Sequence, residues 1–200
     1  MIWLKEVVRD NSISKIEYNR QLHNTSYDLL KIAVEESLKI DFNSLIICKT
    51  SYEKPFFINM PSLYFNLSHC EGLVACTLDR YNVGIDIENI RPYKSHFINK
   101  ILSYSEQILF KEKNLNNLKR NNELFFRFWT LKESYIKAIG RGLSYPLSNI
   151  SFSFDKNNNI ISTKKDYKFK QWVIKNKYIL SLCQSSASKV TNWEDIKWIY

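Results

Sequence analysis

The pattern of apolar and polar residues divides the chain into a helical start, a run of strands, a helical middle and a strand-rich end. Apolar residues recur at helical spacing over residues 26–40, which predicts an amphipathic helix. Four short runs that are apolar or alternate between apolar and polar positions predict strands: residues 45–48, 63–68, 73–78 and 83–88. The last two strands are expected to be joined by a turn at residues 79–82.

The middle of the chain predicts two helices. Ser103 and Glu106 form a capping-box pattern, in which the hydroxyl accepts from an orphan amide and the glutamate reaches back. This pattern opens a helix that runs to about residue 113. Residues 114–122 are polar and loop-like, whereas residues 123–139 carry the strongest helical pattern of the chain. Gly140 then supplies a residue that tolerates the left-handed conformation of a helix C-terminus.

After Pro146 the pattern predicts strands again, at residues 150–154 and in a hairpin formed by residues 167–174 and 178–183. Each half of the chain therefore offers one main helical region and several strands. This mixture predicts an α+β fold.

Composition excludes several classes of protein. Four glycines and four prolines in 200 residues exclude collagen-like, linker-like and low-complexity chains. No apolar run approaches the ~18 residues of a membrane span, and charged residues follow Met1 within a few positions, so a signal peptide is not expected. The four cysteines lack zinc spacing. Reduced thiols in a cytoplasmic protein are the expectation.

The net charge of +9 has two interpretations. A basic excess favours an acidic partner, such as a phosphorylated ligand, a nucleic acid or an acidic protein. The abundance of lysine, asparagine and isoleucine is equally consistent with a compositional bias that has no bearing on function. The charge alone does not decide between them.

A first group of polar residues surrounds the strand at residues 63–68. Ser68 and His69 fall where this strand ends in a turn, and their donors could hold a phosphate. A capped strand end is the structural alternative. Lys54 precedes them in the segment Glu53-Lys54-Pro55.

A second group lies on the strand at residues 83–88. Asp86 and Glu88 are two residues apart, so both point to one face, about 6.6 Å apart along the strand. Paired carboxylates favour a hard cation such as Mg²⁺, although a solvated outer face would show the same pattern. Gly84 shares that face, and its missing side chain is expected to leave room for a ligand.

A third group lies on the strongest predicted helix. Glu133 and Lys137 are one turn apart on one face. An ordinary surface ion pair would have this spacing too. The rest of the helix is strongly apolar, however, which favours a buried helix with a narrow charged stripe.

Taken in this order, the three groups resemble the Sfp-type 4′-phosphopantetheinyl transferase superfamily. The resemblance rests on Lys54-Pro55 and on residues 65–69, 84–88 and 129–143. It implies two similar α+β halves related by a pseudo-twofold, which we expect at residues 1–82 and 83–200, with the active site in the cleft between them. It also implies a monomer.

The resemblance further implies a reaction. A 4′-phosphopantetheine group would pass from coenzyme A to a serine of an apo acyl or peptidyl carrier protein, releasing adenosine 3′,5′-bisphosphate. Asp86, Glu88 and Glu133 would hold Mg²⁺, or Mn²⁺, against the pyrophosphate. Lys137 would bind phosphate, and Glu133 is the candidate acceptor of the serine proton. The carrier could belong to fatty acid biosynthesis or to secondary metabolism.

The same resemblance assigns His69, together with Ser68, to the 3′-phosphate of coenzyme A, and Lys54 to the vicinity of the nucleotide. The chain departs from the family pattern at Glu53, where the family usually has glycine, and at residues 23–25, where many members carry an arginine.

Other functions remain open at the level of sequence. The basic charge and the aromatic content are compatible with a nucleic-acid-binding α+β module, although no RNP-like strand motif or DNA-reading helix is present. A Mg²⁺-dependent phosphohydrolase would use similar carboxylates. An inactive homologue that only binds a partner is disfavoured by the presence of Asp86, Glu88, Glu133 and Lys137. Neither nucleic acid nor a membrane is the expected partner.

Overall fold

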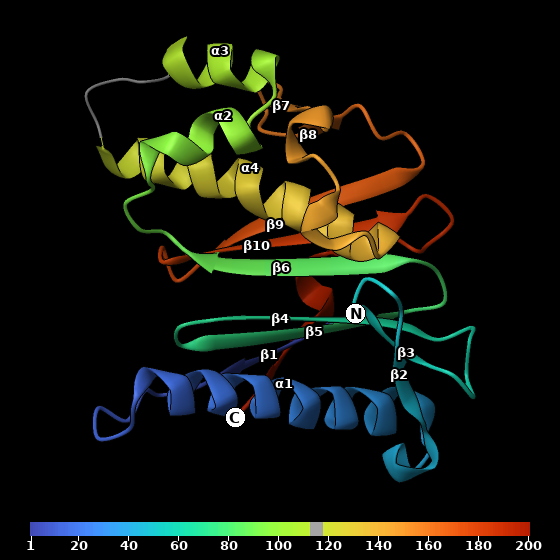
Figure 1. Cartoon of the computed structure of the whole chain (residues 1–200). Coiled ribbons are helices and arrows are strands. Elements are labelled where there is room, and N and C mark those ends of the chain that lie inside the picture. The colour runs from blue at the N-terminus through green and yellow to red at the C-terminus, as the bar shows by residue number, and fades with distance from the viewer. Residues whose placement is uncertain (113–117) are drawn as a thin grey trace.

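A computed structural model describes residues 1–112 and 118–200 of the chain, which form four stacked layers (Figure 1). A long helix, a first sheet, a second sheet and another long helix follow one another in space. The first half of the chain contributes β1 (Ile2–Glu6), α1 (Lys15–Leu38), β2 (Ile47–Lys49), β3 (Pro55–Phe57), β4 (Tyr64–Cys70) and β5 (Leu73–Asp79).

The second half contributes the remaining elements. They are β6 (Val83–Asn89), α2 (Ile98–Ile101), α3 (Tyr104–Glu112), α4 (Leu118–Ile139), β7 (Phe152–Phe154), β8 (Ile160–Ser162), β9 (Tyr167–Ile174), β10 (Tyr178–Ser185) and β11 (Ile196–Ile199). Helices and strands are thus mixed along the chain, and the predicted α+β class is confirmed.

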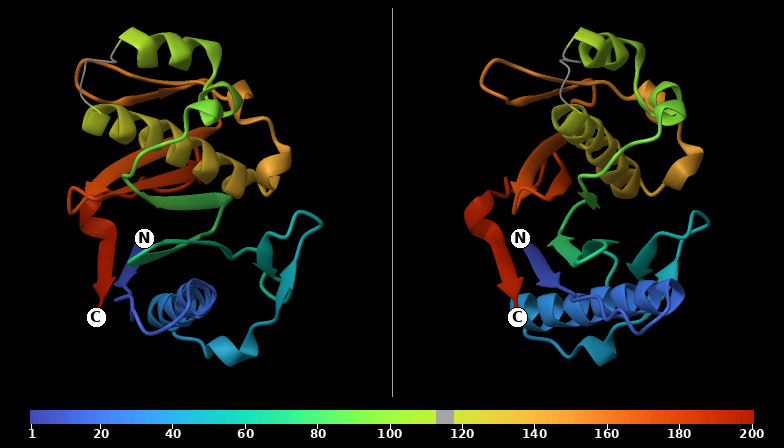
Figure 2. Two further views of the ribbon diagram at one scale, coloured as in Figure 1. Left: turned by 60° about the vertical axis from the view of Figure 1, so that its left-hand side comes forward. Right: turned by 90° about the vertical axis from the view of Figure 1, so that its left-hand side faces the viewer.

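The two halves repeat one order of elements. Each begins with a strand and continues through a long helix and a short two-stranded hairpin to a long antiparallel hairpin; the second half adds α2 and α3 before its long helix and β11 after its last hairpin. The sheet orders correspond as well, because β1-β5-β4 in the first half matches β6-β10-β9 in the second. The predicted division at residues 82 and 83 stays a prediction. One strand of the second range belongs to the sheet of the first: β11 pairs in parallel with β1 and lies beside it in Figure 2.

Helix α1 covers the outer face of the first sheet. It begins at a capping box in which Ser14 accepts from the amide of Glu17 and the Glu17 carboxylate accepts from the amide of Ser14. Its buried residues pack with Trp3 of β1 and with apolar residues of β4 and β5 in one core. The helix therefore extends further toward the N-terminus than the predicted range, because the Ser14 cap opens it at Lys15.

Helix α4 covers the outer face of the second sheet and has its own apolar core with α3 and β7. The predicted capping box opens α3, where the amide of Ser103 donates to Glu106 Oε2 at 2.7 Å. The predicted C-cap at Gly140 is also confirmed by its φ of +68°. The predicted loop at residues 114–122 is wrong over residues 118–122, which are helical; residues 114–117 lie outside the described residues.

A third core lies between the two sheets. It joins inward residues of β1, β5, β6 and β10, among them Ile2, Leu4, Ile85 and Leu182. The neighbouring edges of the sheets meet at β4 and β6, which are not hydrogen-bonded as a ladder. Instead, the side chains of Asn66 and Ser68 accept from the amides of Ile85 and Ile87, at 2.8 Å and 3.2 Å. These two side chains join the halves.

Several predicted strands are confirmed, including the hairpin of β9 and β10. The strands predicted at residues 73–78 and 83–88 are present as β5 and β6, but the turn between them separates two sheets, since β5 pairs with β1 and β4. Strands β1 and β11 were not expected from the pattern. In the part of the chain that the structure describes, no helix is long and apolar enough to cross a bilayer.

Candidate active site

Three of the candidate residues meet where β4, β6 and α4 come together. The Lys137 ammonium lies 2.6 Å from Asp86 Oδ1 and donates to Ser68 Oγ at 3.0 Å. Ser68 Oγ in turn donates to Asp86 Oδ1 at 2.9 Å. Asp86 and Ser68 are buried, with 5% and 6% of their surface exposed. A polar cluster is therefore built at the junction of the two halves.

The hydroxyl of Ser68 has an unexpectedly complete set of partners. It donates to Asp86 and accepts from Lys137 and from the amide of Ile87. A hydroxyl offers one donor and two acceptor positions, so its capacity is fully used by protein groups. Its predicted contact with a phosphate stays a prediction, and the structure adds a second role, that of holding β4 against β6.

Glu133 lies beside this cluster on α4, one turn before Lys137. The pKa of Glu133 is raised to about 7, mainly by burial and then by the negative charges of Asp86 and Glu88, while Lys137 lowers it. Glu133 Oε1 and Asp86 Oδ2 are buried oxygens that have no hydrogen-bond partner among the described residues. Because an unpaired buried carboxylate oxygen is costly, two such oxygens in one cluster indicate a position for a cation or a proton.

Glu88 shares the face of β6 with Asp86, as predicted from the strand period. Its Oε2 accepts from Arg91 Nη1 at 2.6 Å, so one carboxylate oxygen is already paired. Burial raises the pKa of Glu88, and the contact with Arg91 opposes that rise. Its predicted role as a third metal ligand stays a prediction.

His69 does not join Ser68. Neighbouring residues of a strand point to opposite faces, and Ser68 points to β6 while His69 lies on the face of β4 that packs against α1. Burial lowers the pKa of His69, and the positive charges of Lys137 and His23 lower it further. The lowered pKa disfavours the charged imidazolium form of His69, and its predicted phosphate contact stays a prediction.

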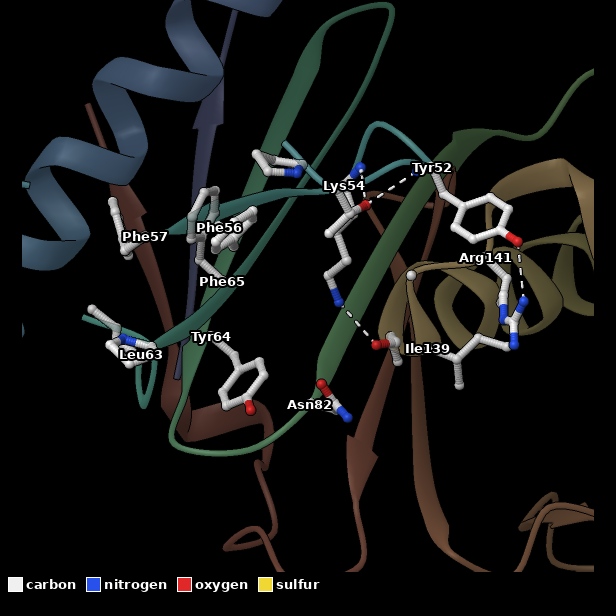
Figure 3. Close-up of a pocket in the computed structure, with 15 residues that line it drawn as sticks. Tyr52, Lys54, Phe56, Phe57, Leu63, Tyr64, Phe65, Asn82, Ile139 and Arg141 are labelled. Carbon is white, nitrogen blue, oxygen red and sulfur yellow. Dashed lines mark hydrogen bonds between the residues drawn. The ribbon is translucent and has the colours of Figure 1, made fainter. Parts of the chain in front are cut away.

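Lys54 lies apart from the carboxylates, at the C-terminal end of α4. Its ammonium donates to the carbonyl of Ala138 at 2.8 Å and to that of Val83 at 3.4 Å. It crosses a cavity of about 410 Å³ bounded by aromatic residues such as Tyr52, Phe56 and Tyr64 (Figure 3). Lys54 therefore connects the loop before β3 to the second half.

The expectation for Gly84 is wrong. A Cβ atom at this position would overlap the backbone of Ser134 and Ala138 on α4, so the missing side chain leaves room for a helix. The close approach brings α4 against β6, and this contact sets Lys137 beside Asp86. Glycine thus serves the site through packing rather than by opening space for a ligand.

The donor set of the site can be compared with what a magnesium ion needs. Among residues 1–112 and 118–200, no cluster of three or more histidine, cysteine, aspartate or glutamate side chains is arranged to hold a metal. Mg²⁺ in phosphate-transferring proteins commonly uses only one or two carboxylates together with phosphate oxygens. The unpartnered oxygens of Asp86 and Glu133 offer such a pair.

Two features near the site were not assigned from sequence. The side chain of Asn66 accepts a hydrogen bond from a backbone amide at the edge of β6. The sequence signal for this role is its position two residues before Ser68, which puts both side chains on the same face of the strand. Glu53, the departure from the family glycine, has a φ of +63°, so it keeps the left-handed backbone that a glycine would adopt. Its carboxylate pairs with Lys49 at 2.8 Å on the surface.

Curated relatives cover the same part of the chain. The chain is 30% identical over 125 residues to the 4′-phosphopantetheinyl transferase Sfp of Bacillus subtilis (strain 168), covering 62% of this chain and 54% of that protein. It is 35% identical over 129 residues to the 4′-phosphopantetheinyl transferase gsp of Aneurinibacillus migulanus, covering 64% and 52%. The chain thus spans about half the length of these curated relatives.

Among solved structures, the holo-[acyl-carrier-protein] synthase of Thermotoga maritima matches with a TM-score of 0.42 and 24% identity, covering 51% of this chain and 61% of that one. A family model described as the 4′-phosphopantetheinyl transferase superfamily matches residues 82–183, just over half of the chain. This segment begins just before β6 and contains Asp86, Glu133 and Lys137. The chain belongs to the 4′-phosphopantetheinyl transferase superfamily.

Proposed function

We propose that this protein transfers the 4′-phosphopantetheine group of coenzyme A to a serine of an apo acyl or peptidyl carrier protein, releasing adenosine 3′,5′-bisphosphate. The observation that carries the proposal is the cluster of buried Asp86 and Glu133 with the partly exposed Lys137, in which two carboxylate oxygens lack partners among the described residues. Phosphoryl transfer depends on neutralising phosphate oxygens and on polarising the attacking hydroxyl, and this cluster contains groups for both tasks.

Asp86 and Glu133 would hold Mg²⁺ or Mn²⁺ through those oxygens, with Glu88 as a further ligand. The ion, when bound, neutralises charge on the pyrophosphate and on the oxygen that leaves. Lys137 binds a phosphate oxygen with its ammonium, which its present contact with Asp86 Oδ1 keeps close to the carboxylates. Asp86 thereby orients both a cation and the lysine.

Glu133 accepts the proton of the carrier serine, directly or through a water molecule. In the protein without a metal ion, burial raises the pKa of Glu133 to about 7, so its carboxylate is a stronger base than an ordinary glutamate, which supports this role. Its position one helical turn from Lys137 brings the base to the phosphate-binding side of α4.

The first half contributes binding groups. His69 contacts the 3′-phosphate of coenzyme A from β4, and the nearby Lys137 ammonium supplies positive charge that favours an anion there. Ser68 supports the same region by fixing Lys137. Lys54 and the aromatic cavity that it crosses receive the nucleotide.

We further propose that the protein acts as a cytoplasmic monomer in fatty acid or secondary metabolism, without nucleic acid or membrane partners. Support for the compartment comes from the cysteines Cys48, Cys70, Cys76 and Cys183, all of which are free thiols. Support for an acidic carrier partner comes from the net charge of +9, which would steer the encounter.

The test incubates the protein with coenzyme A, Mg²⁺ and several apo carrier proteins, and follows the intact mass of each carrier. We expect a gain of one phosphopantetheine group on at least one carrier. If no carrier gains mass where a known transferase modifies all of them, the proposal is wrong. Release of phosphate from coenzyme A without a carrier would instead indicate a phosphohydrolase.

A further inference from the structure

Lys132 is buried and Lys54 is half-buried, and the surroundings of these two lysines differ. Lys132 of α4 is fully buried, and its ammonium contacts Glu106 Oε2 at 2.6 Å and the carbonyls of Leu147 and Ile150 at 2.9 Å and 2.6 Å. These three acceptors match the three N–H bonds of a charged ammonium. Lys132 is thus held as a cation by a carboxylate.

Lys54 has a different set of partners. The described residues offer its amine two acceptors, the carbonyls of Ala138 and Val83, and neither is charged. A neutral amine has two N–H bonds and one lone pair. Both bonds can therefore be satisfied while the lone pair remains available, which is the arrangement of a nucleophile rather than of an ion pair.

The cavity around Lys54 reinforces this difference. Its volume is about 410 Å³, and none of the described residues that line it is acidic. The ionisable groups that face Lys54 are Arg141 after α4, Tyr52 in its own loop, Tyr64 on β4 and Cys183 on β10. Burial lowers the pKa of Lys54 to about 8, and only the distant Cys183 opposes it. A cavity without carboxylates leaves the charged form of the amine poorly compensated.

We propose that Lys54 is a reactive amine that accepts acyl groups from small acyl thioesters entering this cavity. The amine lone pair attacks the thioester carbonyl carbon, the carbon–sulfur bond breaks, and the thiolate leaves. The amine loses one proton, which the thiolate takes up. An amide and a free thiol result, and no other reactant is consumed. This proposal does not rest on the transferase activity proposed above.

Acylation would alter the junction between the halves. An amide nitrogen keeps only one N–H, so the contact with Ala138 or the contact with Val83 must be lost. Because Lys54 links the loop before β3 to the end of α4, its modification would loosen the first half from the second at the mouth of the cavity (Figure 3).

The experiment treats the full chain with S-acetyl-N-acetylcysteamine, a thioester without a nucleotide, at several pH values. Digestion and mass spectrometry give the initial acetylation rate at each lysine. At pH 7.5 an amine with a pKa of about 8 is roughly one quarter unprotonated, against roughly 0.1% for an ordinary lysine. We expect Lys54 to react about tenfold or more faster than exposed lysines, with a rate that levels off above pH 8.

Lys49 is the matched internal control, since it lies five residues away and its pKa is raised by its hydrogen bond to Glu53. Lys132 should stay unlabelled. In concentrated guanidinium, Lys54 should react like Lys49. A native rate at Lys54 equal to or below that of Lys49, or one that keeps rising in parallel with it to pH 10, would overturn the proposal. A Lys54→Arg variant, which should lose this label alone, verifies the assignment of the peptide.

Discussion

The two halves of the molecule share one order of elements but differ at the contact between the first strand and the long helix. In the first half, Trp3 stands on the helix-facing side of β1, and its indole packs into an apolar core with α1. In the second half, Gly84 occupies the helix-facing side of β6, and α4 approaches until no Cβ would fit. The bulk of Trp3 stands between α1 and β1, whereas the absence of a side chain at Gly84 allows α4 to contact β6 directly.

The different spacing between helix and strand in the two halves is accompanied by a difference in the side chains that each helix buries. The buried residues of α1 are apolar or aromatic apart from Ser26, and none of its Asp, Glu, Lys, Arg or His side chains is buried. Helix α4 buries Lys132 and Glu133, and it brings Lys137 into contact with Asp86. The same arrangement of helix and sheet therefore buries mainly apolar side chains in the first half and also buries charged side chains in the second.

The largest expected effect is a loss of carrier modification when a residue of α4 is substituted but not when a matched residue of α1 is. Glu133→Gln removes the proposed proton acceptor, and we expect carrier modification to fall by about 10²–10⁴-fold. The fold should persist, since the variant removes a buried carboxylate oxygen that lacks a partner. Glu36→Gln on α1, which weakens a half-buried contact with Trp3 and an exposed one with Lys197, is the matched change in the first half and should leave the rate within about twofold. Equal losses in both variants would refute the division of labour.

A second prediction concerns the close approach of α4 to β6. Gly84→Ala forces a methyl group against the backbone of Ser134 and Ala138, and we expect a loss of about 3 kcal/mol in the free energy of unfolding. Gly142→Ala is the control, because its Cβ would be no closer than 3.9 Å to another residue; it carries only the penalty for a φ of +56°, about 1 kcal/mol. Urea unfolding measures both, and comparable losses would show that the contact is not tight.

The pH dependence of stability should also differ between the halves. Burial raises the pKa of Glu133 from 4.5 to about 7, so between these values the folded protein holds a proton that the unfolded chain has released. Stability should therefore fall as the pH rises from about 4.5 to 7, by at most about 3 kcal/mol from this group. In Glu133→Gln that part of the slope should vanish. An unchanged slope in urea unfolding across this range would contradict the raised pKa.

The smallest expected effect lies in the loop before β3. Glu53 adopts a left-handed backbone at a φ of +63°, and Glu53→Gly should raise the free energy of unfolding by about 1 kcal/mol despite losing the exposed pair with Lys49. Glu53→Ala keeps the unfavourable backbone and loses the same pair, so it should bring no gain. A gain in both variants would trace the effect to the carboxylate instead of the backbone.

Local patterns predicted the elements that carry the site. The alternation around Asp86 placed it opposite the core residues of β6, and the capping residues Ser103 and Gly140 marked the helix boundaries. These features depend on neighbours in sequence. The capping box of Ser14 and Glu17 at the start of α1 is likewise a local feature.

Contacts between distant segments were not predictable in this way. Nothing in the spacing of Asn66 and Ser68 shows that their side chains would serve the amides of another strand. Gly84 could be read as space for a ligand or for a helix, and only the position of α4 decides. Strand β11 has a partner 194 positions away, since Ile196 lies opposite Ile2, and no local signal encodes that pairing.

The pairing of β11 with β1 has a consequence during synthesis. Residues 2–5 can gain their parallel neighbour only after residues 196–199 have been made, and at ordinary rates of translation this interval is roughly 10–40 s. Until then β1 exposes one edge, held by β5 alone. The nascent first half is therefore expected to need shielding by the ribosome surface or by a chaperone while the second half is being translated.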